Sequence, residues 1–254
     1  MKKRRCLVHE LVLNKDKSII TVVNGISYVL IKLCKYKNDK VFLNDINYIQ
    51  NMTANIECDK SLVRNDWIKL WSEKIDYYEY QISQVGKKYP LLCDSLSYFI
   101  GMGENAISYL VNNLNSKTNV NLVVSHKRIY QESGSLNFYD PLNFVVDSRV
   151  RDVAEFIKET FYNKTLNLYD LKSYFNMANL NKNEYILLLG RLLFPTYYFD
   201  IYDDIINKGK SEELVINIID RTDEYESLLN TIYKFILYEK KARLEPIEWL
   251  QDKN

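Results

Sequence analysis

The pattern of apolar residues changes near residue 65, from short runs typical of strands to the spacing of helices. Before this point the runs are rich in Val, Ile and Leu, and Asn24-Gly25 between two of them is a type I′ hairpin signal. The runs are Cys6–Leu13, Ser18–Val23 and Ile26–Leu33. We therefore expect a small antiparallel meander, with Lys40–Ile49 as a candidate extension.

An apolar stripe after the change predicts a first helix, with Asn65 or Asp66 as its N-cap. Two tryptophans lie on this stripe, and packing onto the rest of the protein is favoured over a ligand-stacking role. A second helix is expected after Pro90, with a bend or break near Gly101 and Gly103.

Strand character returns at Val120–Val124 and around Leu136–Val146, with Gly134 in the turn between them, and helical spacing follows. The later helices are predicted at 147–162, 168–177, 182–207, 212–219 and 223–241. This order predicts an α+β, bilobal plan, with residues 1–64 as a reduced β-rich lobe and residues 65–254 as a mainly helical lobe.

Charge and cysteine pattern exclude several functional classes. The 34 Lys and Arg residues against 33 Asp and Glu give a net charge of +1, so no overall field favours nucleic acid or a membrane as partner. The four cysteines form no CxxC pair and there are two histidines, which argues against a zinc site or a disulfide framework. His9 and Glu10 interrupt the apolar stretch behind the basic start, so we expect no export signal and a cytoplasmic protein.

A phosphotransferase needs a basic group on the phosphates, a carboxylate base and two oxygen ligands for magnesium. Lys32 ends an apolar strand and is a candidate for the phosphates, the alternative being an exposed lysine on an amphipathic strand. The turn Asn14–Ser18 stands where a phosphate-covering loop belongs, yet it contains no glycine. ATP and magnesium are therefore not expected as cofactors, unless the chain is a working phosphotransferase.

His126-Lys127-Arg128 follows the strand that begins at Val120, and here the chain resembles the protein kinase and aminoglycoside phosphotransferase superfamily. The catalytic loop of that superfamily has His, then Asp two positions later, then Asn five positions further on. Arg128 stands at the Asp position and Ser133 at the Asn position. Since the pKa of a guanidinium stays above about 12, Arg128 is no general base. The resemblance implies that His126 is structural.

A closer resemblance is to endospore coat-associated proteins (CotS-like and YutH-like) within that superfamily. The matching stretches follow the family's order over roughly residues 65 to 250, while the first 60 residues match poorly. They are Glu104–Leu110, Arg151–Ile157, Arg191–Pro195 with Tyr197–Phe199, and Ile247–Leu250. The resemblance implies a kinase-like fold and a role in the spore coat.

Four residues after the catalytic loop resemble the acidic motifs of the superfamily. Asp140 is the candidate magnesium ligand, although Pro141-Leu142 follows it in place of Phe-Gly. Asp147, Arg151 and Asp152 resemble the group that ties the next helix to the catalytic loop, and we expect structural roles, with Asp147 as a helix N-cap and Asp152 as a buried hydrogen-bond acceptor. Further along, Asp200, Asp203 and Asp204 are expected on a solvated helix face.

Three functions remain open at this point. The favoured one is a catalytically inactive pseudokinase that acts through a protein partner, by resemblance a spore coat component. The alternatives are a small-molecule phosphotransferase of the aminoglycoside or choline kinase type, and a nucleotide-sensing module. Arg128, Ser133 and the glycine-free turn favour the first.

Overall fold

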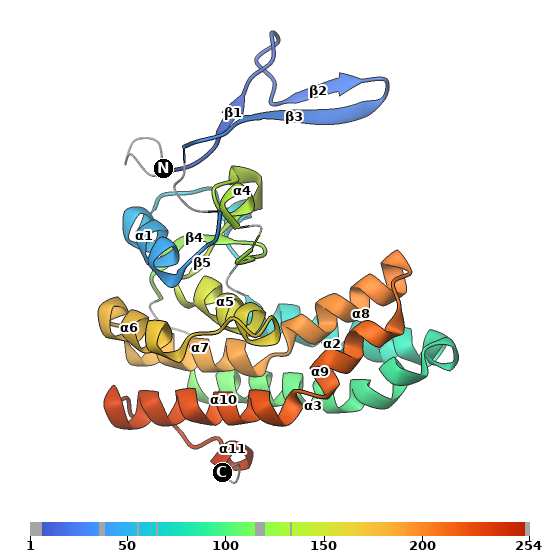
Figure 1. Cartoon of the computed structure of the whole chain (residues 1–254), viewed down its shortest axis with the longest axis vertical. Helices are drawn as coiled ribbons and strands as arrows, with labels where there is room; N and C mark the ends of the chain where they lie inside the picture. The colour runs from blue at the N-terminus through green and yellow to red at the C-terminus, as the bar shows by residue number, and fades with distance from the viewer. Residues whose placement is uncertain are drawn as a thin grey trace.

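The computed structural model describes residues 7–35, 39–54, 56–64, 66–114, 120–132 and 134–251. Its N-terminal part is an antiparallel sheet of β1 (Glu10–Val12), β2 (Ile20–Val23) and β3 (Ile26–Lys32), in the order β1-β3-β2. Asn24 and Gly25 between β2 and β3 have φ angles of 52° and 76°, as a type I′ turn requires. The predicted antiparallel sheet and its hairpin are confirmed, but the predicted meander order is wrong, because β1 pairs with β3 instead of β2. The sheet projects from the rest of the molecule (Figure 1).

The predicted extension of the sheet over Lys40–Ile49 is wrong, because this segment enters α1 (Leu43–Thr53). The Phe42 N–H donates to Asp45 Oδ2 at 2.9 Å, which starts the helix. Leu43, Ile46 and Ile49 are buried at helical spacing. Thr53 at the end of α1 donates to the Ile49 carbonyl and accepts from the Val124 N–H at 3.0 Å, so α1 lies against the second sheet.

The next two helices are α2 (Trp67–Val85) and α3 (Pro90–Asn113), after a short 3-10 turn η2 (Lys60–Leu62). Asp66 is the N-cap residue of α2, while Asn65 lies outside the described residues. Of the bend or break predicted near Gly101 and Gly103, the break is wrong, because α3 is continuous there. A Cβ at Gly103 would lie 2.9 Å from Ile75 Cδ1, so this glycine permits close packing of α2 and α3.

A second sheet is the antiparallel hairpin of β4 (Leu122–His126) and β5 (Phe144–Ser148), with Val123 opposite Asp147. The predicted strand over Leu136–Val146 is therefore mostly wrong. Its first part is α4 (Gly134–Phe138) followed by the 3-10 turn η4 (Pro141–Asn143), because Pro141 has no N–H for a ladder and Asp140 caps the turn.

The C-terminal body is helical, and one predicted helix is divided in two. The long helix expected at 182–207 becomes α7 and α8, because Pro195 lies between them. The elements are α5 (Val150–Tyr162), α6 (Leu168–Ala178), α7 (Lys182–Leu193), α8 (Thr196–Lys208), η5 (Glu212–Val215), α9 (Ile216–Ile219), α10 (Thr222–Lys234), the π-helical turn η6 (Phe235–Glu239) and α11 (Glu248–Gln251).

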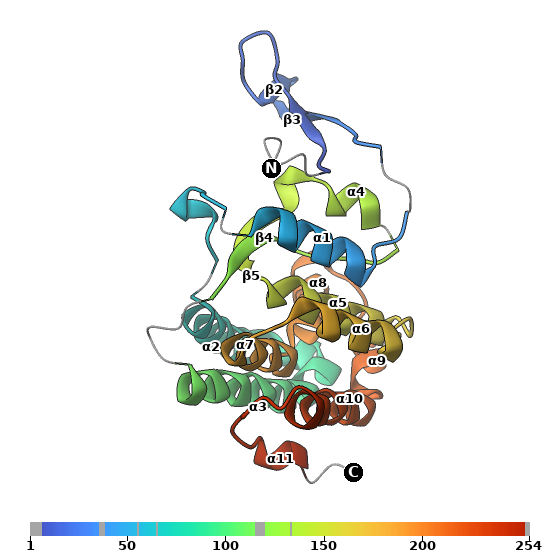
Figure 2. The same cartoon turned by 90° about the vertical axis from the view of Figure 1, so that its left-hand side faces the viewer.

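Helix α7 is the centre of this body. Every residue from Glu184 to Leu193 is buried, with α3 and α5 packed on it, and α10 lies along the outside (Figure 2). A Cβ at Gly190 would lie 2.4 Å from Leu110 Cδ2, so α7 and α3 approach closely. Among the described residues, no helix has the length and apolarity needed to span a membrane.

The molecule thus has the predicted α+β, kinase-like plan, with a small sheet at one end and a mainly helical body (Figure 1). The division into lobes near residue 64 remains a prediction. Helix α1 precedes that position in sequence, yet it packs on β4, α5 and α6.

Candidate functional site

His126 ends β4 and lies 1% exposed beneath the loop that follows. Its ring stacks on Phe138 with centroids 4.5 Å apart. Nδ1 is 2.6 Å from Asp152 Oδ2, and Nε2 is 2.8 Å from the Phe138 carbonyl oxygen. Both ring nitrogens face oxygen atoms of the protein at hydrogen-bond distance, so neither is free to contact a substrate. The geometry agrees with a structural histidine.

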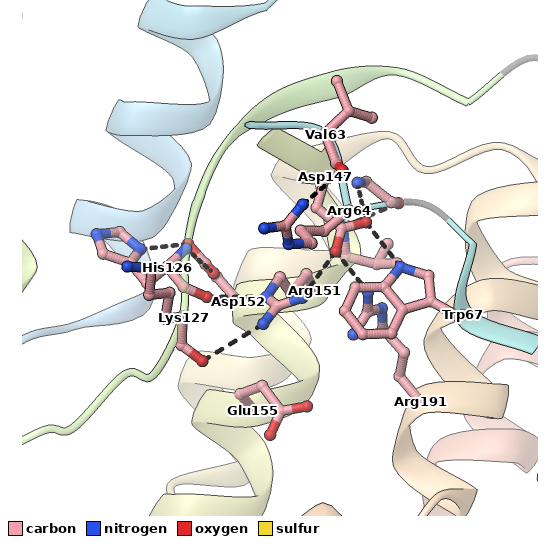
Figure 3. A network of polar contacts seen from close by, with 12 residues as sticks. Val63, Arg64, Trp67, His126, Lys127, Asp147, Arg151, Asp152, Glu155 and Arg191 are labelled. Atoms are coloured by element: carbon pink, nitrogen blue, oxygen red, sulfur yellow. Dashed lines mark hydrogen bonds and ion pairs between the residues drawn. The ribbon is translucent and has the colours of Figure 1, made fainter. Parts of the chain in front are cut away.

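Asp152 lies in the first turn of α5 and is 1% exposed. Besides the imidazole, it accepts the His126 backbone N–H at 2.9 Å. The neighbouring Arg151 donates to the His126 carbonyl at 2.8 Å and to the Lys127 carbonyl at 3.3 Å. Asp152 is therefore the buried acceptor that the sequence predicted, and Arg151 holds the other side of the same loop (Figure 3).

Asp147 is not a helix N-cap as predicted, because it lies within β5 and Arg149 is the N-cap residue of α5. Its carboxylate is fully buried and accepts from Arg151 at 2.9 Å and from Arg191 at 2.7 Å. The Trp67 indole donates to the other oxygen at 3.0 Å. Both guanidinium groups also lie over the Trp67 ring, with the central carbon of Arg151 4.7 Å and that of Arg191 4.0 Å from the ring centroid. Figure 3 shows Arg191 against the ring.

The two tryptophans of the aromatic stripe on α2, Trp67 and Trp71, both pack against the helical body. Trp71 is buried and stacks on Phe194 with centroids 4.3 Å apart, so it packs onto the larger body as predicted. Trp67 combines packing with a polar contact to Asp147 that its sequence position did not indicate. The sequence likewise gave no indication that Arg191 contacts Asp147, apart from its place in a stretch that matches the family. A carboxylate held by two cations and an indole has little capacity left for a metal ion.

Arg128, which the resemblance places at the position of the catalytic carboxylate, donates from Nη2 to Asp200 Oδ1 at 2.5 Å. Lys74 also lies 4.0 Å from the same carboxylate. Burial lowers the pKa of Arg128, but the attraction of Asp200 outweighs it and leaves the pKa raised. Asp200 was expected on a solvated face, yet its side chain is 32% exposed and takes part in this pair. Asn143 fixes the loop by donating to the Arg128 carbonyl at 2.9 Å.

Asp140, the candidate magnesium ligand, is half-buried and accepts the Leu142 N–H at 2.8 Å as the N-cap of η4. Ser133, at the second ligand position, lies outside the described residues. Throughout the described ranges, no three His, Cys, Asp or Glu side chains are grouped so that they could hold a metal ion. Asp140 is thus used in a local turn.

Lys32, the candidate phosphate ligand, is exposed at the end of β3 and stands opposite Glu10 in the ladder. Among the described residues, no hydrogen bond or ion pair joins Lys32 to Arg128 or Asp140. The turn Asn14–Ser18 uses its N–H groups internally, with those of Asp16 and Ser18 donating to Asn14 Oδ1 at 3.0 and 2.9 Å. The backbone groups that would cradle phosphates are thereby occupied.

A pocket of about 450 Å³ opens beside Arg128. Its wall is formed by the loop after β4, by α5 and by α8, and it contains five carboxylate side chains. They are Glu155, Glu159, Asp200, Asp203 and Asp204. The sequence offered no means of placing α5 and α8 together at this loop.

Comparison with known proteins places these features in a family. The sequence profile of the family described as "Spore coat putative kinase YutH" matches residues 1–232, so it includes the first 60 residues, where the sequence alone had matched poorly. The chain is also 29% identical over 207 residues to the endospore coat-associated protein YutH of Bacillus subtilis (strain 168), a match that covers 72% of this chain and 61% of the relative. The chain thus spans less than two thirds of that relative's length. Because the family profile covers nearly the whole chain, this protein belongs to the YutH family of spore coat proteins.

Proposed function

We propose that this chain is a pseudokinase that acts by binding protein components during assembly of the spore coat, on which it is deposited after synthesis in the cytoplasm. Its family and the coat association stated for the Bacillus subtilis relative support the cellular setting. The loop after β4 supports the absence of catalysis.

The Arg128–Asp200 ion pair is the main observation in support of a pseudokinase. A general base must accept the hydroxyl proton of the acceptor, and Arg128 puts a cation that is always protonated where the superfamily has its carboxylate. The 2.5 Å contact with Asp200 holds the guanidinium in that place. Arg128, which stands in place of the base, is therefore paired with Asp200 on α8.

ATP and magnesium do not fit the remaining residues well. Asp140 accepts the Leu142 N–H, and the N–H groups of Asp16 and Ser18 are bonded to Asn14 within their turn. A phosphotransfer site relies on positioning of the triphosphate by such groups. We infer that the protein performs its role without either cofactor.

The test is deposition on spores. In a sporulating host that lacks its own copy, fluorescent fusions of the parent chain and of Asp140→Asn should decorate the spore surface equally. The destabilised Asp152→Ala variant provides the negative control. Loss of deposition in Asp140→Asn, with normal protein levels, would contradict a role independent of magnesium.

A second candidate, a small-molecule phosphotransferase, is favoured by the pocket beside Arg128, which is large enough for a small acceptor. It predicts a nucleotide site in addition. Ligand at 100 times its dissociation constant would stabilise the folded state by about 2.7 kcal/mol. A magnesium-dependent rise in melting temperature with ATP would support this candidate or a nucleotide sensor, and we expect no such rise.

A further inference from the structure

The projecting sheet carries large apolar side chains on its surface. Six of them are half or more exposed, and all six lie on the β2–β3 hairpin, whose turn is Asn24-Gly25. They are Ile20, Val22, Val23, Ile26, Tyr28 and Leu30. Figure 1 and Figure 2 both show the hairpin standing away from the helical body. Exposed apolar groups gathered on one element mark a surface that binds something apolar.

These apolar groups lie on both faces of the hairpin. Neighbouring residues of a strand point to opposite faces, and the ladder sets Val23 opposite Ile26 and Val22 opposite Ser27. One face therefore carries Val23, Ile26, Tyr28 and Leu30, and the other carries Ile20 and Val22. A flat protein surface covers one face of such a hairpin, whereas a fluid apolar medium surrounds both.

Charged residues are confined to the two ends of the apolar stretch. Residues 18–31 contain none, and two exposed lysines stand on either side of them. The lysines are Lys15, Lys17, Lys32 and Lys35. Within residues 10–35 they are opposed by Glu10 and Asp16 alone, so this region is more basic than the whole chain, whose net charge gave no reason to expect a membrane. Lysines beside an apolar element are complementary to anionic lipid headgroups.

The outer edge of the hairpin is partly closed by its own side chains. β2 is an edge strand, but the Ile20 N–H donates to Ser18 Oγ at 3.1 Å, and the Ile20 carbonyl accepts from Asn14 Nδ2 at 3.0 Å. A peptide that added a strand to β2 would have to displace both contacts. Backbone groups that are already bonded also lower the cost of moving the strand into a less polar medium.

We propose that the β2–β3 hairpin docks on the surface of an anionic lipid bilayer, with its apolar side chains in the interface and its lysines at the headgroup phosphates. This role goes beyond the binding of coat proteins and does not depend on the pseudokinase proposal. Interfacial elements enter the boundary of headgroups and acyl chains by about 5–10 Å, and three strand residues span about 10 Å.

The lysines stand at a suitable distance from the tip of the hairpin. Lys17 lies six positions before Val23, and Lys32 lies six positions after Ile26, which are the two residues that flank the turn. Six extended residues span at most about 20 Å, so the long lysine side chains reach the headgroup layer when the tip is in the interface.

A second copy of the chain fits these features less well. Two sheets packed face to face cover one face of each, and the apolar groups of the other face stay in water. Because each hairpin is flanked by an excess of lysines, two copies would also bring like charges together. A bilayer surrounds both faces and attracts the lysines.

The test is sedimentation of the full chain with vesicles of phosphatidylglycerol and phosphatidylcholine at low salt. We expect binding that is lost with phosphatidylcholine alone and weakens at about 0.5 M salt, which screens the lysines. Val22→Thr with Ile26→Thr keeps β-branched residues while making each face more polar, and should weaken binding by about tenfold. Val111→Thr, at a position 55% exposed on α3, is the matched control and should bind as the parent does.

The headgroup contact is tested separately through the charge. Lys15→Gln with Lys17→Gln should weaken binding to the anionic vesicles by about tenfold or more. Because these two lysines are exposed in a turn, this variant decides the question even if the apolar double variant does not fold, as checked by its melting temperature.

Three outcomes would overturn the proposal. They are no vesicle binding at low salt, equal binding to neutral and anionic vesicles, and equal binding by the folded Val22→Thr, Ile26→Thr variant. A dimer in sedimentation equilibrium that dissociates in this variant, without vesicle binding by the parent, would assign the hairpin to a second copy of the chain and reject the bilayer.

Discussion

Individual side chains in this molecule are held by contacts that join distant parts of the sequence. His126 and Asp152 are 26 positions apart, and Arg191 reaches Asp147 from 44 positions away. The first pair was predictable, because Arg-Asp at a helix start resembles the motif that ties a helix to the catalytic loop. The contacts of Arg191 and of Asp200 depend on how α7 and α8 pack, which no local pattern contains.

Replacement of Asp152 should test the anchoring role directly. Asp152→Ala removes the acceptor of the His126 backbone N–H and of its Nδ1, both buried. Orphaned buried donors should lower the free energy of unfolding by about 1 to 3 kcal/mol. Urea denaturation measures the change, with exposed Glu73→Ala as the control. An unchanged denaturant midpoint would show that Asp152 does not stabilise the loop.

Glu159 should give the folded state a recognisable pH dependence. Its ordinary pKa of 4.5 is raised in the fold, chiefly by burial, so the folded state holds the proton more tightly than the unfolded chain does. Its contribution to stability is therefore fully present at low pH and is lost as the pH rises through the raised pKa. The unfolding free energy of the parent relative to Glu159→Gln should fall with pH in urea titrations. A difference that stays flat or grows would contradict this account.

Among the helices and strands, the predictions from sequence were wrong where two helices touch or where a short apolar run has no clear period. Residues 40–49 are apolar enough for either a strand or a helix, and packing on β4 settles the choice for α1. Gly103 was expected to break α3, but its missing Cβ makes room for Ile75. The turn at Asn24-Gly25 was predicted correctly, because there the residue types alone impose the backbone angles.

Alanine substitutions at Gly190 and at Gly101 should change the stability of the protein in opposite directions, because a Cβ has no room at the first and open space at the second. In Gly190→Ala the new Cβ would lie 2.4 Å from Leu110 Cδ2, and the strain should destabilise the protein by about 1 to 3 kcal/mol. Gly101→Ala meets no atom within 4 Å in the middle of α3, and should stabilise by up to about 1 kcal/mol. Thermal unfolding compares the two. Equal melting temperatures would mean that α3 and α7 are further apart than described.

The whole molecule has a kinase-like plan, and we propose that the parts needed for phosphate transfer are not assembled within it. The projecting sheet carries Lys32, and no hydrogen bond or ion pair among the described residues connects it with Arg128 or Asp140. In the helical body, the buried guanidinium groups of Arg151 and Arg191 bond to His126 and Asp147, and these bonds hold β4, β5, α5 and α7 together. The order of strands and helices predicted an α+β, bilobal plan, and the family resemblance implied that it is kinase-like. The pocket between α5 and α8 became apparent only in the folded structure.

We propose that this family member is not a phosphotransferase, and an assay of ATP hydrolysis and phosphate transfer with purified protein and magnesium decides the question. We expect background rates for the parent chain, for Asp140→Asn and for Arg128→Asp. The last variant should stay inactive because a restored carboxylate alone does not position the triphosphate, and positioning supplies most of the catalysis in this chemistry. Turnover by the parent chain that disappears in Asp140→Asn would contradict the account.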